Sequence, residues 1–167
     1  FKTLSYSALF DDKSKINEIN GADPDKRLTY GQLLYKLDNN GNLIPDGNGA
    51  YELKPEVKKD AFISSFLNKN SNLATDLLHY QIDQVVHSDD GLVATAVVDT
   101  KHPETAYLTA RGSTAGTVKQ LWDDWAKANT KLAANEYVTN FEIAQVVDFE
   151  NFIKDVQTKF NYETINP

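Results

Sequence analysis

The 167-residue sequence contains no cysteine and no methionine, and both absences are informative. Without cysteine the chain has no disulfide, no zinc–thiolate site and no cysteine nucleophile. Such a chain suits an oxidising exterior and a reducing cytoplasm equally, so the compartment stays open, with a secreted location among the options. Because the sequence begins at Phe1 and has no methionine, we expect it to be a processed or excised piece of a longer protein.

Clusters of basic residues and long apolar runs are also lacking. The formal net charge is -7, and no group of Lys or Arg offers a face for phosphates, which argues against nucleic-acid binding. No apolar run approaches the roughly 18 residues that a membrane span needs. With 41% hydrophobic and 25% charged residues, the composition is that of a globular chain long enough to bury one core.

The first half of the sequence predicts short helices around a turn-rich segment. Residues 1–27 indicate loop with one short helix, and Asn40-Gly41 and the cluster 46–49 favour tight turns. Pro55 suits the first turn of a helix. A second helix is predicted to begin at Asn72 and to end at 88–91. The apolar positions expected to line these two helices are Val57, Ala61, Phe62, Phe66, Leu67, Leu73, Leu77, Leu78, Ile82, Val85 and Val86.

The second half predicts one β-hairpin followed by two helices. Alternating apolar residues predict that 92–98 pairs with 105–110, with 99–104 as the loop and His102-Pro103 inside the turn. Thr117 and Gln120 have the spacing of a capping box, which predicts a helix from 117 to about 132 with Trp122 and Trp125 buried. A last helix within 139–160 would bring together Phe149, Phe152, Ile153, Val156 and Phe160.

This order of elements indicates an α/β or α+β fold, with helices packed on a small sheet that contains an antiparallel hairpin. We divide the chain into a region of hairpin and helices, 1–90, and a region of hairpin, loop and two helices, 91–167. The two regions are expected to form one continuous domain.

Several candidate sites have simpler explanations. Asp38, Asn40 and Asn42 alternate as in a calcium loop, but the sixth and twelfth positions are Leu43 and Gly49 instead of Gly and Glu, so a hairpin turn is favoured. The histidines have no metal-ligand spacing, the adjacent acids are typical of solvated charges or helix ends, and no serine lies in a G-x-S-x-G elbow. These histidines and acid pairs are His79, His87, His102, Asp11-Asp12, Asp89-Asp90 and Asp123-Asp124.

The most specific stretch is "AYLTARGSTAGTVKQLWDDW", residues 106–125. It resembles the segment of lipase-like α/β-hydrolases, especially the class 3 lipase relatives, in which an apolar strand runs into Arg-Gly-Ser/Thr and then a Trp/Asp element. In that family the Ser or Thr helps to form the oxyanion hole, and the matching residue here is Ser113. The resemblance gives Arg111 and Gly112 the role of shaping the turn. Supporting contacts around the site would come from Trp122, Asp124 and Trp125.

The resemblance covers residues 70–167, although only 106–125 carry the motif. It implies the N-terminal portion of an α/β-hydrolase fold that ends before the nucleophile elbow, acts on lipid or other carboxylic esters and uses no cofactor. The nucleophile serine and the Asp and His of the triad would then lie outside this chain, in the remainder of the hydrolase domain or in a second chain.

Two other hypotheses stay open. One is a non-catalytic binding domain that keeps the hydrolase architecture. The other is an unrelated acidic interaction module, secreted or surface-associated, in which Arg111 forms a surface ion pair, Gly112 bends the chain, and Trp122 and Trp125 belong to the core. A G-x-S-x-G motif within a few tens of residues after Pro167 would separate the enzyme from the binding domain.

Overall fold

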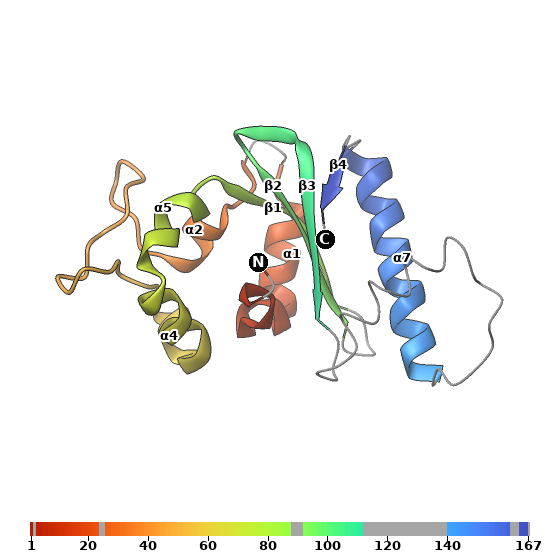
Figure 1. The fold of residues 1–167 in the computed structure, drawn as a ribbon, viewed down its shortest axis with the longest axis horizontal. Helices are drawn as coiled ribbons and strands as arrows, with labels where there is room; N and C mark the ends of the chain where they lie inside the picture. The colour runs from red at the N-terminus through yellow and green to blue at the C-terminus, as the bar shows by residue number, and fades with distance from the viewer. Residues whose placement is uncertain (2, 24–25, 88–91, 112–139, 161–163, 167) are drawn as a thin grey trace.

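The computed structural model describes the chain except for residues 2, 24–25, 88–91, 112–139, 161–163 and 167. The described residues form a mixed α and β structure in which a small sheet lies between two helical layers (Figure 1). The helices are η1 (Leu4–Tyr6), η2 (Ala8–Asp11), α1 (Lys13–Gly21), α2 (Tyr30–Leu34), α3 (Pro55–Lys59), α4 (Ala61–Lys69), η4 (Ser71–Leu73), α5 (Ala74–Leu77) and α7 (Asn140–Phe160). The strands are β1 (Tyr80–His87), β2 (Val93–Asp99), β3 (His102–Arg111) and β4 (Thr164–Asn166).

The sheet has the order β1-β2-β3-β4. The first three strands are antiparallel neighbours, so β1 and the predicted hairpin belong to one sheet. Strand β4 pairs in parallel with β3, from Thr105 opposite Thr164 to Tyr107 opposite Asn166. Since parallel neighbours need a crossover, α7 serves as the helix of a β–α–β unit.

Alternation along β2 and β3 separates two hydrophobic cores. Val93 and Val97 belong to the core formed with the N-terminal helices, whereas Ala94, Ala96 and Leu108 belong to the core that contains α7. Side chains of successive strand residues point to opposite faces, so the period of two explains this division. Both faces of the sheet are therefore covered by helices, as Figure 1 shows.

The predicted pairing of 92–98 with 105–110 is confirmed, but the predicted loop 99–104 is too long. The turn is formed by Thr100 and Lys101, and the Asp99 carboxylate accepts the backbone N–H of Lys101 at 2.9 Å. This contact closes the turn early, so His102 and Pro103 begin β3 instead of lying in the turn.

The predicted helix from Asn72 through Val86 is wrong beyond α5. The chain leaves the helix after Leu77 and forms β1 from Tyr80 to His87, paired with β2. Ile82 and Val85 do lie in the core, but they do so from a strand whose register shifts between Ile82 and Gln84. The apolar residues Ile82, Val85 and Val86 are spaced three and four apart because the register shift interrupts the strand alternation, and this spacing is also that of a helical stripe.

Pro55 begins a helix as predicted, but the helical segment is divided at Asp60 into α3 and α4. The Asp60 carboxylate accepts the backbone N–H of Ile63 at 3.0 Å and so caps α4. Its other oxygen accepts the N–H of Ala8, the first residue of η2, at 3.2 Å. The start of α4 is thus joined to the N-terminal segment.

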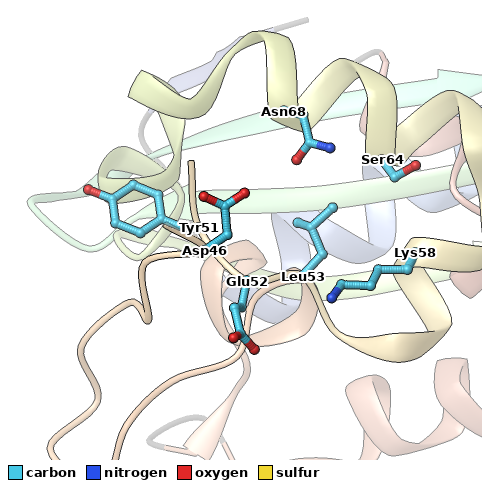
Figure 2. Close-up of a pocket in the computed structure, with 7 residues that line it drawn as sticks. All are labelled: Asp46, Tyr51, Glu52, Leu53, Lys58, Ser64 and Asn68. Atoms are coloured by element: carbon cyan, nitrogen blue, oxygen red, sulfur yellow. The ribbon is translucent and has the colours of Figure 1, made fainter. Parts of the chain in front are cut away.

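The segment between α2 and α3 packs against α4 around a polar hollow of about 190 Å³ (Figure 2). In this segment between α2 and α3, the backbone has positive φ at Gly41, Gly47 and Gly49, which confirms the turns predicted there. The hollow is lined by Asp46, Tyr51, Glu52, Leu53, Lys58, Ser64 and Asn68.

Candidate functional site

The candidate site is the carboxyl end of β3, where the Arg-Gly-Ser motif begins. Arg111 is the last residue of the strand and lies opposite Val93 of β2. Gly112, Ser113, Trp122, Asp124 and Trp125 lie outside the described residues, as does the predicted helix 117–132. The predicted roles of those residues, Ser113 in the oxyanion hole above all, stay predictions.

Arg111 contacts an acid from the other end of the chain. Its guanidinium forms an ion pair with the carboxylate of Asp11, the last residue of η2. The Arg111 side chain is 15% exposed and that of Asp11 is 50% exposed, so solvent screens the pair from one side. The arginine is therefore held by the N-terminal layer, as the surface-ion-pair interpretation expected.

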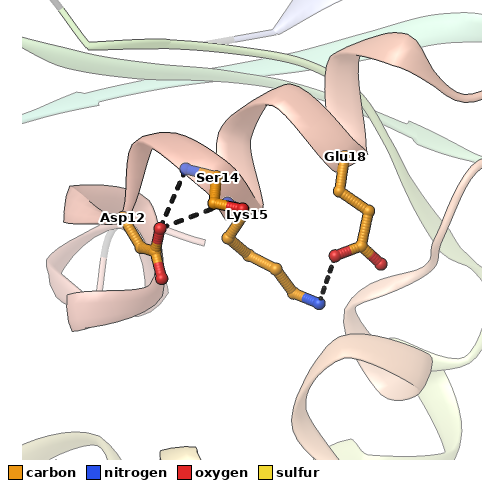
Figure 3. A network of polar contacts seen from close by, with 4 residues as sticks. All are labelled: Asp12, Ser14, Lys15 and Glu18. Carbon is orange, nitrogen blue, oxygen red and sulfur yellow. Dashed lines mark hydrogen bonds and ion pairs between the residues drawn. The ribbon is translucent and has the colours of Figure 1, made fainter.

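Asp11 is positioned by the junction between η2 and α1. The next residue, Asp12, caps α1 by accepting the backbone N–H groups of Ser14 at 2.9 Å and Lys15 at 3.3 Å (Figure 3). Lys15 in turn pairs with Glu18 at 2.8 Å on the same helix. The adjacent acids therefore have different tasks: Asp12 begins a helix, and Asp11 faces the strand end.

Polar side chains continue along the same face of the sheet. The hydroxyls of Thr95 and Thr109 are 2.6 Å apart, and Thr95 is fully buried. Tyr30 of α2 is buried in the adjoining core, and burial raises the pKa of its hydroxyl. Thr109 and Arg111 are two positions apart on the strand, so both side chains point toward the N-terminal helices.

A second buried polar group lies on β1. Asp83 is 3% exposed and pairs with Arg27 at 3.2 Å, and Gln81 donates to the same carboxylate oxygen at 3.3 Å. Burial raises the pKa of Asp83, against the opposing influence of Arg27. This ion pair was not predicted from the sequence, although an acid between the apolar residues Ile82 and Val85 is a signal that could have found it.

Two of the three histidines, His79 and His102, lie at the same end of the sheet, and His87 lies at the other end. His79 precedes β1, His87 ends β1, and His102 begins β3 at the opposite end of the strand from Arg111. Among the residues that the structure describes, no group of three His, Asp or Glu side chains could hold a metal ion. In the predicted turn, the Asp38 carboxylate accepts the N–H groups of Asn40 and Asn42 at 2.8 Å each, so it stabilises the backbone.

The hollow beside α4 offers no activated nucleophile among its lining residues. The hydroxyl of Ser64 is 3.4 Å from the carbonyl oxygen of Ala61, one turn earlier on the helix. The ion pair of Glu52 with Lys36, at 2.6 Å, lowers the pKa of Glu52 and keeps that carboxylate charged. A charged carboxylate of this kind is a poor general acid or base near neutral pH.

Comparison of the chain with models of protein families, with curated proteins and with solved structures finds no match. Within the described part of the chain, no helix is long and apolar enough to cross a bilayer.

Proposed function

We propose that this chain is the N-terminal portion of a lipase- or esterase-like serine hydrolase with an α/β-hydrolase fold. In this proposal Ser113 contributes to the oxyanion hole, and the nucleophile serine and the triad Asp and His lie beyond Pro167 or in a second chain. The reaction is attack by that serine on the carbonyl of a lipid or other carboxylic ester, with a histidine as general base.

The observation that supports the proposal most strongly is the parallel pairing of β3 and β4. Parallel neighbours have their carboxyl ends at the same edge of a sheet, where open α/β sheets bind their ligands. In α/β-hydrolases one oxyanion donor comes from a loop after an early strand, and the nucleophile sits on the turn after a later strand. The loop after Arg111 and the turn after β4 would have these positions.

The register of the pair sharpens this argument. The paired residues of β3 and β4 differ by 59 in number, so about residue 170 of a strand that continued in this register would lie beside Arg111. A serine on a turn just beyond that point would face the loop that contains Ser113. Donors in this loop could then stabilise the oxyanion that forms on the substrate carbonyl.

The test compares this chain with a longer protein that contains it and continues past Pro167. We expect the 167-residue chain to hydrolyse p-nitrophenyl esters no faster than background, because it supplies no activated nucleophile. The longer protein should hydrolyse them and should react with a fluorophosphonate at one serine after residue 167.

Two outcomes would contradict the proposal. A longer protein that folds, lacks hydrolysis and resists the fluorophosphonate would favour the non-catalytic binding domain. Hydrolysis by the 167-residue chain that is abolished when one internal serine is replaced by alanine would put the catalytic centre elsewhere. Mass spectrometry of the labelled peptide identifies the reacting serine in either protein.

A further inference from the structure

Helix α4 presents an aromatic side chain to solvent. Phe62 is 62% exposed and is the one large hydrophobic side chain exposed among the residues described. It lies at a hollow of about 490 Å³, lined by Ala61, Phe62, Ser65, Phe66, Lys69 and Asn70, which we call the α4 surface. Phe66 packs against the core beneath it, so the α4 surface is anchored on its inner side.

The charge around the α4 surface differs from that of the whole chain. The chain is acidic, with a net charge of -7, but residues 54–70 contain more lysines than acids. Lys69 lines the α4 surface and Lys59 is exposed just before α4, whereas Lys58 lines the other hollow together with Glu52. The two acids of this segment are Asp60, whose carboxylate accepts two backbone N–H groups, and the exposed Glu56. The basic residues in this segment are Lys54, Lys58, Lys59 and Lys69.

The α4 surface is also linked to the carboxyl end of β3. Asp60, the cap of α4, accepts the N–H of Ala8, and η2 runs from Ala8 to Asp11. Asp11 then pairs with Arg111. Figure 1 shows α4 toward the end of the sheet where β3 finishes, opposite the turn between β2 and β3. The N-terminal segment η2 therefore connects the start of α4 with the carboxyl end of β3.

We infer that the α4 surface docks the protein on a lipid bilayer with anionic headgroups. An exposed phenylalanine flanked by lysines is typical of interfacial helices, in which the aromatic ring enters the headgroup region and the lysines attract the anionic lipid. A symmetric dimer through the same surface would place lysines against lysines. Repulsion between these like charges disfavours a second copy of the chain as the partner. The inference deepens the proposed function and rests on it, because it names the lipid surface that would present the ester.

The test is flotation of the 167-residue chain with vesicles of ether-linked phospholipids, which have no ester to hydrolyse. One vesicle contains equal parts of phosphatidylcholine and phosphatidylglycerol, and the other contains phosphatidylcholine alone. We expect binding to the anionic vesicle that weakens with added salt, because exposed charges are screened. Phe62→Gln should weaken binding about tenfold, since it removes the aromatic ring that would enter the headgroup region. Lys69→Gln should weaken it about fivefold.

Lys101→Gln is the matched control, because Lys101 is exposed in the turn at the far end of the sheet. It should bind as the unchanged chain does. Circular dichroism checks that each variant is folded. If Phe62→Gln does not fold, the binding of Lys69→Gln tests the docking surface by itself.

The inference is overturned if the unchanged chain does not bind anionic vesicles, or if folded variants at Phe62 and Lys69 bind as well as the Lys101 control. Self-association that depends on Phe62, measured by sedimentation, would assign the surface to a second copy instead. Hydrolysis of soluble esters by the longer protein without vesicle binding would refute the docking alone. Vesicle binding without any hydrolysis would refute the proposed hydrolase alone.

Discussion

The two faces of the sheet are built from different side chains. Toward α7 the strands present small apolar residues, such as Ala94, Ala96 and Ala110, on which Phe149 and Phe152 pack. Toward the N-terminal helices the same strands present the threonine pair and Arg111 among valines. Small residues let a helix approach the sheet closely, whereas hydroxyls and a guanidinium need partners. One face is thus specialised for packing, and the other positions the polar group at the candidate site.

The largest effect is expected where the packing face is broken. Phe152→Ala removes a side chain that is 1% exposed and leaves a cavity, so the free energy of unfolding should fall by about 3–5 kcal/mol. Urea denaturation of the purified chain measures this change. Lys154→Ala, at an exposed position of α7, should stay within about 0.5 kcal/mol of the unchanged chain. Similar stabilities for the two variants would mean that α7 does not cover the sheet.

A smaller effect is expected on the polar face. Thr95→Val removes the bond between the buried Thr95 and the half-buried Thr109, which should cost about 1 kcal/mol of unfolding free energy. Replacing both threonines with valine should restore much of that loss, because neither side chain then lacks a partner. The exposed Thr100→Val is the control. Simple additivity of the two single changes would refute the pairing.

The smallest effect is expected at Asp83, where burial and pairing act in opposite directions on the pKa. Burial dominates and raises the pKa of Asp83 in the folded protein above its ordinary value. Between the pKa of the group in the unfolded protein and its higher pKa in the folded protein, the folded state binds more protons than the unfolded state. The free energy of unfolding therefore falls as the pH rises through this range. At pH values above both pKa values, the full loss of unfolding free energy remains.

Asp83→Asn cannot ionise, yet it keeps an oxygen that can accept from Arg27. We therefore expect the variant to be more stable than the unchanged chain at neutral pH, with the difference vanishing below the ordinary aspartate pKa. Chemical denaturation across a pH series measures this. A variant that is less stable at neutral pH, with the gap widening as the pH rises, would show that the Arg27 pairing outweighs burial.

The predictable parts of this fold are those with a clear period. Residues 92–98 and 105–110 alternate and were placed correctly in a hairpin, and Phe149, Phe152 and Val156 recur at helical spacing in α7. Strand β1 has no such signal, because polar residues lie among its apolar ones and its register shifts between Ile82 and Gln84. Local patterns could not resolve a helix from a strand there.

The candidate site was predictable only in part. The strand end at Arg111 follows from the alternation and the glycine after it, but the partner of Arg111 is Asp11, 100 positions earlier. Nothing in a local window distinguishes Asp11 from Asp12, although one faces the strand end and the other caps a helix. Such contacts are set by the packing of distant segments, which one sequence does not encode in its spacing.

The most direct test of the central claim is the ester hydrolysis of Ser113→Ala in the longer protein. If the strand ends on Arg-Gly-Ser to aim a hydroxyl donor at the reacting carbonyl, the loss appears in the transition state, where the oxyanion exists. We expect kcat to fall on the order of 100- to 1000-fold while KM changes little, with the folded structure retained. An unchanged kcat in the folded Ser113→Ala protein would contradict the claim that the Ser113 hydroxyl stabilises the oxyanion.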